Sequence, residues 1–227
     1  MGKKINVVVA GHSSFAWGLV EQLRTEVMGR LYFVLPERDQ AMEASLLDDV
    51  IAIHGEITDT AVLDQLNLET CHTFIAGSRG QEANVLSALY ARNSGAQAAY
   101  ARVFDTKFMP LLDAVGVIPI QTSHMAAARM KVRALKPAVA ELVQPTHGPF
   151  VLDEIRVSQY PELVGCQLGQ LHSKELHVVA VAHGDDVQIN YETVIEADAV
   201  LVVIYNRQVT RNLAQALRRV TRDCPPE

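Results

Sequence analysis

The sequence contains no hydrophobic run long enough to cross a lipid bilayer. A transmembrane helix needs about 20 consecutive apolar residues, whereas the longest apolar run, residues 199–205, has the length of a strand. The N-terminus also lacks the apolar core of a signal peptide, because Lys3 and Lys4 lead directly into a short apolar segment. We therefore expect a cytoplasmic protein with no segment inserted into the membrane.

Motifs for metal binding and for nucleophilic catalysis are also missing. The three cysteines form no Cys-x-x-Cys pair, and the eight histidines contain no His-x-x-x-His or His-Glu-x-x-His motif. The sequence therefore predicts no metal site. The Gly-x-Ser-x-Gly motif of serine hydrolases is absent as well. The net charge is −6 and no basic run is present, which argues against nucleic acid as a partner.

What the sequence does contain is a strand, a turn and a helix between residues 5 and 20. The apolar run at 7–10 ends at Gly11, and apolar residues then recur every four positions at Phe15, Leu19, Leu23 and Val27. In dinucleotide-binding folds this turn carries Gly-x-Gly-x-x-Gly, which binds a pyrophosphate at the helix N-terminus. Here the three positions are Gly11, Ser13 and Ala16. Because Ser13 adds a Cβ where the backbone must approach phosphate, we expect the fold to be kept and the ligand site to be weakened.

Strand and helix patterns alternate along the following hundred residues. Short β-prone segments at 31–35, 50–54, 72–76, 98–103 and 117–120 predict five further strands, and helical spacing occurs at 39–47, 59–66 and 81–92. This alternation implies right-handed crossovers between parallel strands. The predicted fold class is α/β, with a Rossmann-like doubly wound parallel sheet.

A helix rich in alanine and methionine is predicted at residues 122–135. Its small and flexible side chains suit contacts with a second subunit, although a helix that simply covers the core has the same pattern. Lys136-Pro137 and the segment QPTHGP at 144–149 then predict a boundary. We accordingly divide the chain into a domain at 1–143 and a C-terminal subdomain at 144–227.

The C-terminal subdomain has a different pattern. Residues 150–157, 178–183 and 199–205 are β-prone, and a hairpin-type turn at 183–186 leads into residues 187–189. An amphipathic helix is predicted at 208–220. These elements predict a small α+β unit.

Several short motifs occur at the ends of the predicted strands. Residues 55–59 read GEITD, residues 76–78 read AGS with Glu82 and Asn84 following, and Ala101-Arg102 lies on the fifth strand. In the second unit, 161–168 read PELVGCQL and 195–203 read IEADAVLVV. On these motifs the chain resembles, over nearly its whole length, the RCK domain, also called KTN or TrkA-type, followed by the RCK C-terminal subdomain. It departs from the family pattern at Glu56, which replaces Asp, and at two missing glycines in 195–203.

The resemblance implies a cytoplasmic regulatory domain or subunit of a potassium channel or transporter, which couples ligand binding to ion flux and is not an enzyme. It also implies a homodimer or larger ring, and a location at the inner face of the cell membrane through a membrane partner or a fused pore. The implied ligand is an adenine nucleotide: ATP, ADP or NAD.

The turn at Gly11 and the segment Leu35-Pro36-Glu37 are most similar to Kch-type and calcium-activated potassium channels, whose nucleotide-reading features are weakened. Leu35 stands where RCK domains carry an acidic residue for the ribose, and Glu37 is the nearest substitute. We hypothesise a degenerate nucleotide site made of Gly11, His12, Ser13, Ser14, Phe15, Glu37, Glu56, Ser78 and Arg102.

Other interpretations stay open at this point. An NAD-dependent oxidoreductase would have the same sheet, although the second unit is small and offers no acid–base pair. A structural dimerisation domain that binds nothing is the third possibility. His12 either contacts a phosphate or bonds to the local backbone. The acidic residues Glu37, Asp39, Glu56 and Asp59 either bind a divalent cation at the strand ends or cap helices and face solvent.

Overall fold

The structure, a computed structural model, describes residues 5–27, 29–142, 150–184, 186–210 and 212–221. It divides into two compact units, Met1–Ala127 and Ala128–Glu227, and each is described by itself. The domain boundary predicted between residues 143 and 144 lies outside the described residues. No helix among the described residues has both the length and the apolar character that a membrane span requires.

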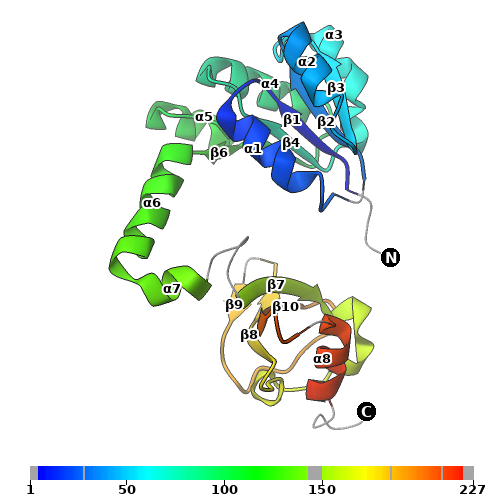
Figure 1. Ribbon diagram of the computed structural model, residues 1–227, viewed down its shortest axis with the longest axis vertical. Coiled ribbons are helices and arrows are strands. Elements are labelled where there is room, and N and C mark those ends of the chain that lie inside the picture. The colour runs from blue at the N-terminus through cyan, green and yellow to red at the C-terminus, as the bar shows by residue number, and fades with distance from the viewer. Residues whose placement is uncertain (1–4, 28, 143–149, 185, 211, 222–227) are drawn as a thin grey trace. The chain divides into compact units, whose positions relative to one another are not determined.

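The first unit is built on a parallel sheet of six strands in the order β3-β2-β1-β4-β5-β6 (Figure 1). Its first strand, β1, pairs with β2 on one side and with β4 on the other. The predicted Rossmann-like doubly wound sheet is therefore confirmed. The strands are β1 (Val7–Ala10), β2 (Leu31–Leu35), β3 (Val50–His54), β4 (Thr73–Ala76), β5 (Ala98–Arg102) and β6 (Ile118–Ile120).

Helices cover both faces of this sheet, and alternate residues of the central strand β1 are buried on opposite sides. Val7 and Val9 of β1 pack with the helices α1 and α2, whereas Val8 and Ala10 pack with α3, α4 and α5. These helices are α1 (Ser14–Leu23), α2 (Arg38–Ala44), α3 (Thr60–Leu63), α4 (Gln81–Asn93) and α5 (Met109–Ala114). Helix α5 was not predicted, because six residues are too short for a periodic signal, but its Leu112 is fully buried.

Helix α6 (Thr122–Leu135) begins in the first unit and ends in the second. None of its residues is buried. Helix α7 (Pro137–Leu142) follows directly and starts with the proline that was predicted to mark a boundary. A proline is tolerated at the first helical position, where its missing N–H would have no partner. The Lys136-Pro137 pair therefore separates two helices, and the predicted linker at 144–149 lies outside the described residues.

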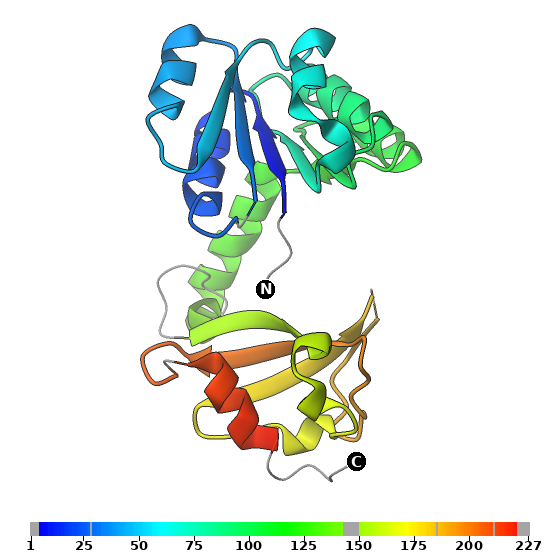
Figure 2. The same ribbon diagram turned by 90° about the vertical axis from the view of Figure 1, so that its right-hand side faces the viewer.

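The second unit contains an antiparallel sheet in the order β7-β10-β8-β9, with helix α8 packed against one face (Figure 2). The predicted hairpin turn is present, with His183 paired to Asp186. Helix α8 begins at Leu213, five residues later than predicted, and the side chain of its N-cap Asn212 accepts a hydrogen bond from the Gln215 amide. The elements are β7 (Phe150–Arg156), β8 (Leu176–His183), β9 (Asp186–Gln188), β10 (Val200–Asn206) and α8 (Leu213–Val220).

Short 3-10 helices complete the connections in both units. They are Asp64–Leu66, Leu68–Thr70, Thr106–Phe108, Val157–Gln159, Pro161–Leu163 and Leu168–Gln170.

Candidate functional site

The candidate site lies where the strand order reverses. The chain leaves β1 toward β2 on one side of the sheet, and β4 takes the position on the other side. In open parallel sheets, ligands bind at such a switch point, outside the carboxyl ends of the strands. The turn after β1 and the turn after β4 meet at this place.

Gly11 makes the close approach of these two turns possible. Its φ is +104°, a conformation that residues with a side chain rarely adopt. A Cβ atom at this position would lie 2.5 Å from the Ser78 Cβ and 2.7 Å from the Ser78 nitrogen. Position 11 therefore requires glycine, as the sequence indicated.

Ser13 is the N-cap of α1, and its side chain is turned into the protein. The hydroxyl donates to the Gly77 carbonyl and accepts from the Ala16 amide at 3.1 Å, and the residue is only 2% exposed. The Ser13 Cβ therefore does not enter the solvent-facing space in front of the helix. The expectation that the Ser13 Cβ weakens a phosphate site stays a prediction, but the hydroxyl itself points away from such a site.

Helix α1 still offers hydrogen-bond donors at its N-terminus. Its first backbone bond runs from the Trp17 amide to the Ser13 carbonyl at 3.1 Å, and Ala16 is capped by Ser13. The amides of Ser14 and Phe15 have no acceptor within the described part of the chain. Two free amides and the positive end of the helix dipole are suited to an anion.

The first turn of α4 holds the ends of β4 and β5 in place. The Asn84 side chain, which is fully buried, accepts from the Ser78 amide at 2.8 Å and donates to the carbonyls of Ser78 and Arg102. Gln81 accepts from the amides of Phe104 and Asp105, both at 3.0 Å. These two side chains fix the backbone around Ser78 and Arg102. The sequence analysis did not assign Gln81 a role, because its contacts are with residues more than twenty positions away.

Arg102 places a positive charge beside the α1 turn. Its guanidinium lies 5.7 Å from the centre of the Phe15 ring and 4.9 Å from that of Phe104. Its Nε donates to the Thr122 hydroxyl at 3.2 Å, and Nη1 to the Ser78 carbonyl at 3.5 Å. Partial burial lowers the pKa of Arg102, but an arginine remains charged at neutral pH. The guanidinium thus connects the site with the first residue of α6.

The remaining predicted residues lie in other positions. His12 is half-buried in the turn after Gly11. Glu37 is exposed at the start of α2 and accepts from the Gln40 amide group at 2.9 Å. Glu56 is exposed after β3. Within the described residues, neither glutamate forms a hydrogen bond or ion pair with the α1 turn. The structure thus brings Gly11, Ser13–Phe15, Ser78 and Arg102 together, and shows no contact that joins Glu37 or Glu56 to them.

Two of the acidic residues near the strand ends lie at helix starts. The Asp59 side chain caps α3 by accepting from the Ala61 amide at 2.9 Å, and Asp39 lies in the first turn of α2. The capping interpretation is confirmed for Asp59. In the described part of the chain, Glu37, Asp39, Glu56 and Asp59 do not form a group of converging ligand atoms.

This fold and the turn after β1 define a Rossmann-type domain of the nucleotide-binding class, joined to a small antiparallel unit. The TrkA-N domain family matches residues 7–122. The chain belongs to this family, which confirms its resemblance to RCK and TrkA-type domains.

Two relatives are named as the Trk system potassium uptake protein TrkA or as its homolog. The chain is 26% identical over 212 residues to the Trk system potassium uptake protein TrkA of Haemophilus influenzae, covering 88% of the chain and 44% of that protein. It is 26% identical over 178 residues to a TrkA homolog of Methanothermobacter thermautotrophicus, covering 76% of the chain and 80% of that protein. The chain thus spans less than half the length of the first relative.

Solved structures share the fold at low sequence identity. The human SLO3 gating ring matches with a TM-score of 0.60 and 10% identity, covering 95% of this chain and 46% of that one. The TrkA-N domain of the Escherichia coli inner membrane protein ybaL matches with a TM-score of 0.50 and 17% identity, covering 60% of this chain and 100% of that one. The structure of GsuK bound to ADP matches with a TM-score of 0.50 and 18% identity, covering 59% of this chain and 35% of that one.

Proposed function

We propose that the chain is the ligand-sensing regulatory part of a potassium uptake or channel system. It would act at the cytoplasmic face of the membrane through a membrane-embedded partner, and its work would be conformational and not catalytic. Membership of the TrkA-N family supports this function, as do the relatives named as Trk potassium uptake proteins. The likeness in fold to a gating ring is consistent with it.

The proposed ligand is an adenine nucleotide whose phosphates lie at the N-terminus of α1. The observation that carries this proposal is the α1 turn, where the Ser14 and Phe15 amides have no acceptor among the described residues and the Ser13 hydroxyl bonds to the Gly77 carbonyl. Arg102 would supply the positive charge, because its guanidinium stacks beside Phe15. GsuK, which shares the fold, has been solved with ADP bound.

Arg102 also suggests how binding would reach the rest of the chain. A phosphate next to the guanidinium would compete with the Thr122 hydroxyl, which Arg102 now holds at 3.2 Å. Thr122 is the first residue of α6, and α6 continues into the second unit. A ligand that binds one orientation of α6 better than another shifts the population toward it. This differential binding is the coupling that a gating function needs.

A pair of substitutions at Ser14 tests the phosphate position. Ser14→Asp places a negative charge at the positive end of α1, which should stabilise the free protein by about 0.3–1 kcal/mol. The same charge repels a phosphate, so ADP affinity in isothermal titration calorimetry should fall at least about tenfold. Ser14→Ala is the matched control, because it removes only an exposed hydroxyl and keeps the amide. Equal ADP affinity in both variants would exclude this site.

Two further measurements test the alternative functions, an NAD-dependent oxidoreductase and a structural dimerisation domain. Turnover of NAD or NADH, followed by nicotinamide absorbance, would identify an oxidoreductase. Failure of ATP, ADP and NAD to bind the unmodified chain would leave a structural dimerisation domain.

We further propose that the chain forms a homodimer or larger ring through α6. Met125, Ala128, Val132 and Leu135 recur at helical spacing and form one stripe. Met125 is 64% exposed and Leu135 is 71% exposed. An apolar stripe of this kind on a helix with no buried residue fits a second copy of the chain.

A further inference from the structure

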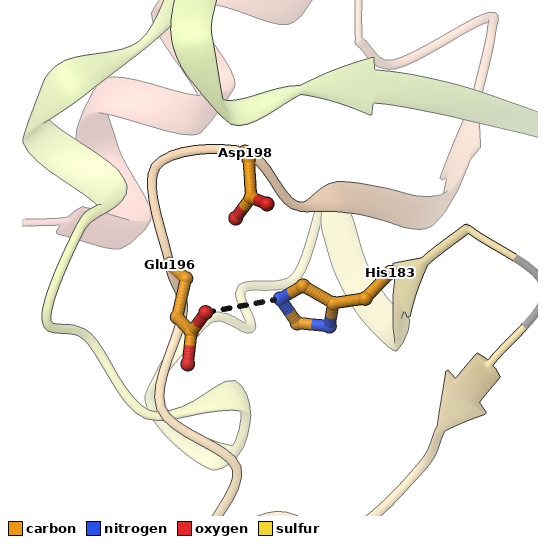
Figure 3. Close-up of side chains that lie close together, drawn as sticks. All are labelled: His183, Glu196 and Asp198. Carbon is orange, nitrogen blue, oxygen red and sulfur yellow. Dashed lines mark ion pairs between the residues drawn. The ribbon is translucent and has the colours of Figure 1, made fainter.

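A second group of converging side chains lies in the C-terminal unit and includes none of the residues proposed to bind a nucleotide. His183 ends β8, and Glu196 and Asp198 lie in the segment that leads into β10. One ligand atom of each residue lies within 4.8 Å of the other two, and the His183 Nε2 is 3.8 Å from a Glu196 carboxylate oxygen (Figure 3). The three side chains thus point to one small space.

The imidazole of His183 provides an independent observation. Its Nε2 has essentially no solvent-accessible surface and no hydrogen-bond partner among the described residues, while the ring as a whole is 26% exposed. A shielded polar nitrogen without a partner costs free energy, so such atoms need an explanation. The Glu196 oxygen is too distant for a hydrogen bond at 3.8 Å. A bound cation between the two would satisfy both atoms.

The backbone that carries the two carboxylates is fixed. Ile195 and Ala199 flank them and are each 1% exposed. The Ile195 amide donates to the Cys166 carbonyl at 2.9 Å, and the Ala199 carbonyl accepts from the Val157 amide at 3.0 Å. Pairing of β8 with β10 places His183 next to the start of β10. The side chains of Glu196 and Asp198 remain exposed, so they can adjust over a rigid base.

We propose that His183, Glu196 and Asp198 bind a divalent transition-metal ion of the Zn²⁺ type. One imidazole and two carboxylates suit Zn²⁺, whereas Mg²⁺ and Ca²⁺ favour ligand sets made of oxygen alone. In a tetrahedral Zn²⁺ site the ligand atoms lie roughly 3.4 Å apart, as bond lengths of about 2.1 Å require. The separations here need only a small rotation of the exposed carboxylates. Three protein ligands leave the fourth position for water.

Such an ion would join the end of β8 to the segment before β10. Both lie in the second unit, whereas the proposed nucleotide site lies in the first. The proposal is independent of nucleotide binding. Because metal bound only to the folded state stabilises it by mass action, the ion would also raise the melting temperature of the chain.

Calorimetric titration of the chain with Zn²⁺ tests the proposal. We expect one ion per chain, and at least tenfold weaker binding in both His183→Gln and Glu196→Gln. His177→Gln is the matched control, because His172 and His177 stack with ring centres 6.4 Å apart on the same unit and are a second place where Zn²⁺ could bind. Binding should be unchanged in this variant, and excess Mg²⁺ should not displace the Zn²⁺.

Each of the following results would overturn the proposal: no Zn²⁺ binding by the unmodified chain, unchanged binding in Glu196→Gln, or loss of binding in His177→Gln in place of the other two variants. Displacement by Mg²⁺ would equally contradict a site built around an imidazole. If His183→Gln fails to fold by circular dichroism, Glu196→Gln still decides, because its side chain is 70% exposed and the change keeps its size.

Discussion

At the scale of single residues, the hydroxyl of Ser13 has two functions. It caps α1 through the Ala16 amide, and it joins the turn after β1 to the turn after β4 through the Gly77 carbonyl. An N-cap of this kind contributes about 1 kcal/mol. Ser13, which stands in place of the second glycine, therefore stabilises the turn between β1 and α1.

Gly11 should be the least replaceable residue of this turn. Gly11→Ala must adopt a positive φ and press a methyl group against the Ser78 backbone, which we expect to cost roughly 2–5 kcal/mol. Gly18→Ala, in the middle of α1, is the matched control because a Cβ there meets nothing within 4 Å. That change should stabilise the protein by about 0.5–1 kcal/mol. Urea unfolding measures both changes, and a Gly11→Ala protein as stable as the unmodified one would contradict the geometry described.

Residue types and positions in the turn could be predicted, but side-chain directions could not. The sequence showed which residue replaces each glycine, whereas the inward turn of Ser13 depends on Gly77, which lies 64 positions away. His183, Glu196 and Asp198 were missed for the same reason. Their convergence depends on the pairing of β8 with β10, and no short motif records it.

At the scale of elements, the strands were predicted best. The segments 31–35 and 50–54 match β2 and β3 at both ends. All five residues of β2 are buried, as expected of a continuous apolar run covered by helices on both faces. Helix ends were less predictable. Helix α2 stops at Ala44, where the predicted helix continued to residue 47, since helix ends depend on local hydrogen bonds as well as on apolar spacing.

The exposed stripe of α6 leads to a prediction about assembly. Leu135→Asp should lower the stability of the single chain by no more than about 1 kcal/mol, because the side chain is exposed and the new charge lies at the C-terminal end of α6. A charge in the proposed interface should nevertheless shift the protein from dimer to monomer in light scattering coupled to size-exclusion chromatography. Leu86→Asp on α4, another exposed leucine, serves as control and should leave the assembly unchanged. A Leu135→Asp protein that elutes with the same mass as the unmodified protein would place the interface elsewhere.

At the scale of the whole molecule, the chain combines a candidate site at the carboxyl ends of a parallel sheet with helix α6, which continues from the first unit into the second. Arg102 and Thr122 form the connection between them. The order of elements along the chain was sufficient to predict the two folds. The boundary predicted between residues 143 and 144 stays a prediction, and the continuous helix α6 belongs to both compact units.

Native mass spectrometry of the purified chain with and without ADP tests the central claim most directly, because it reports assembly and ligand together. The account predicts a dimer or larger assembly that takes up one ADP per chain, and a Ser14→Asp protein of the same assembly that takes up none. An unmodified chain that assembles without binding ADP, ATP or NAD would contradict a nucleotide site at the switch point between β1 and β4.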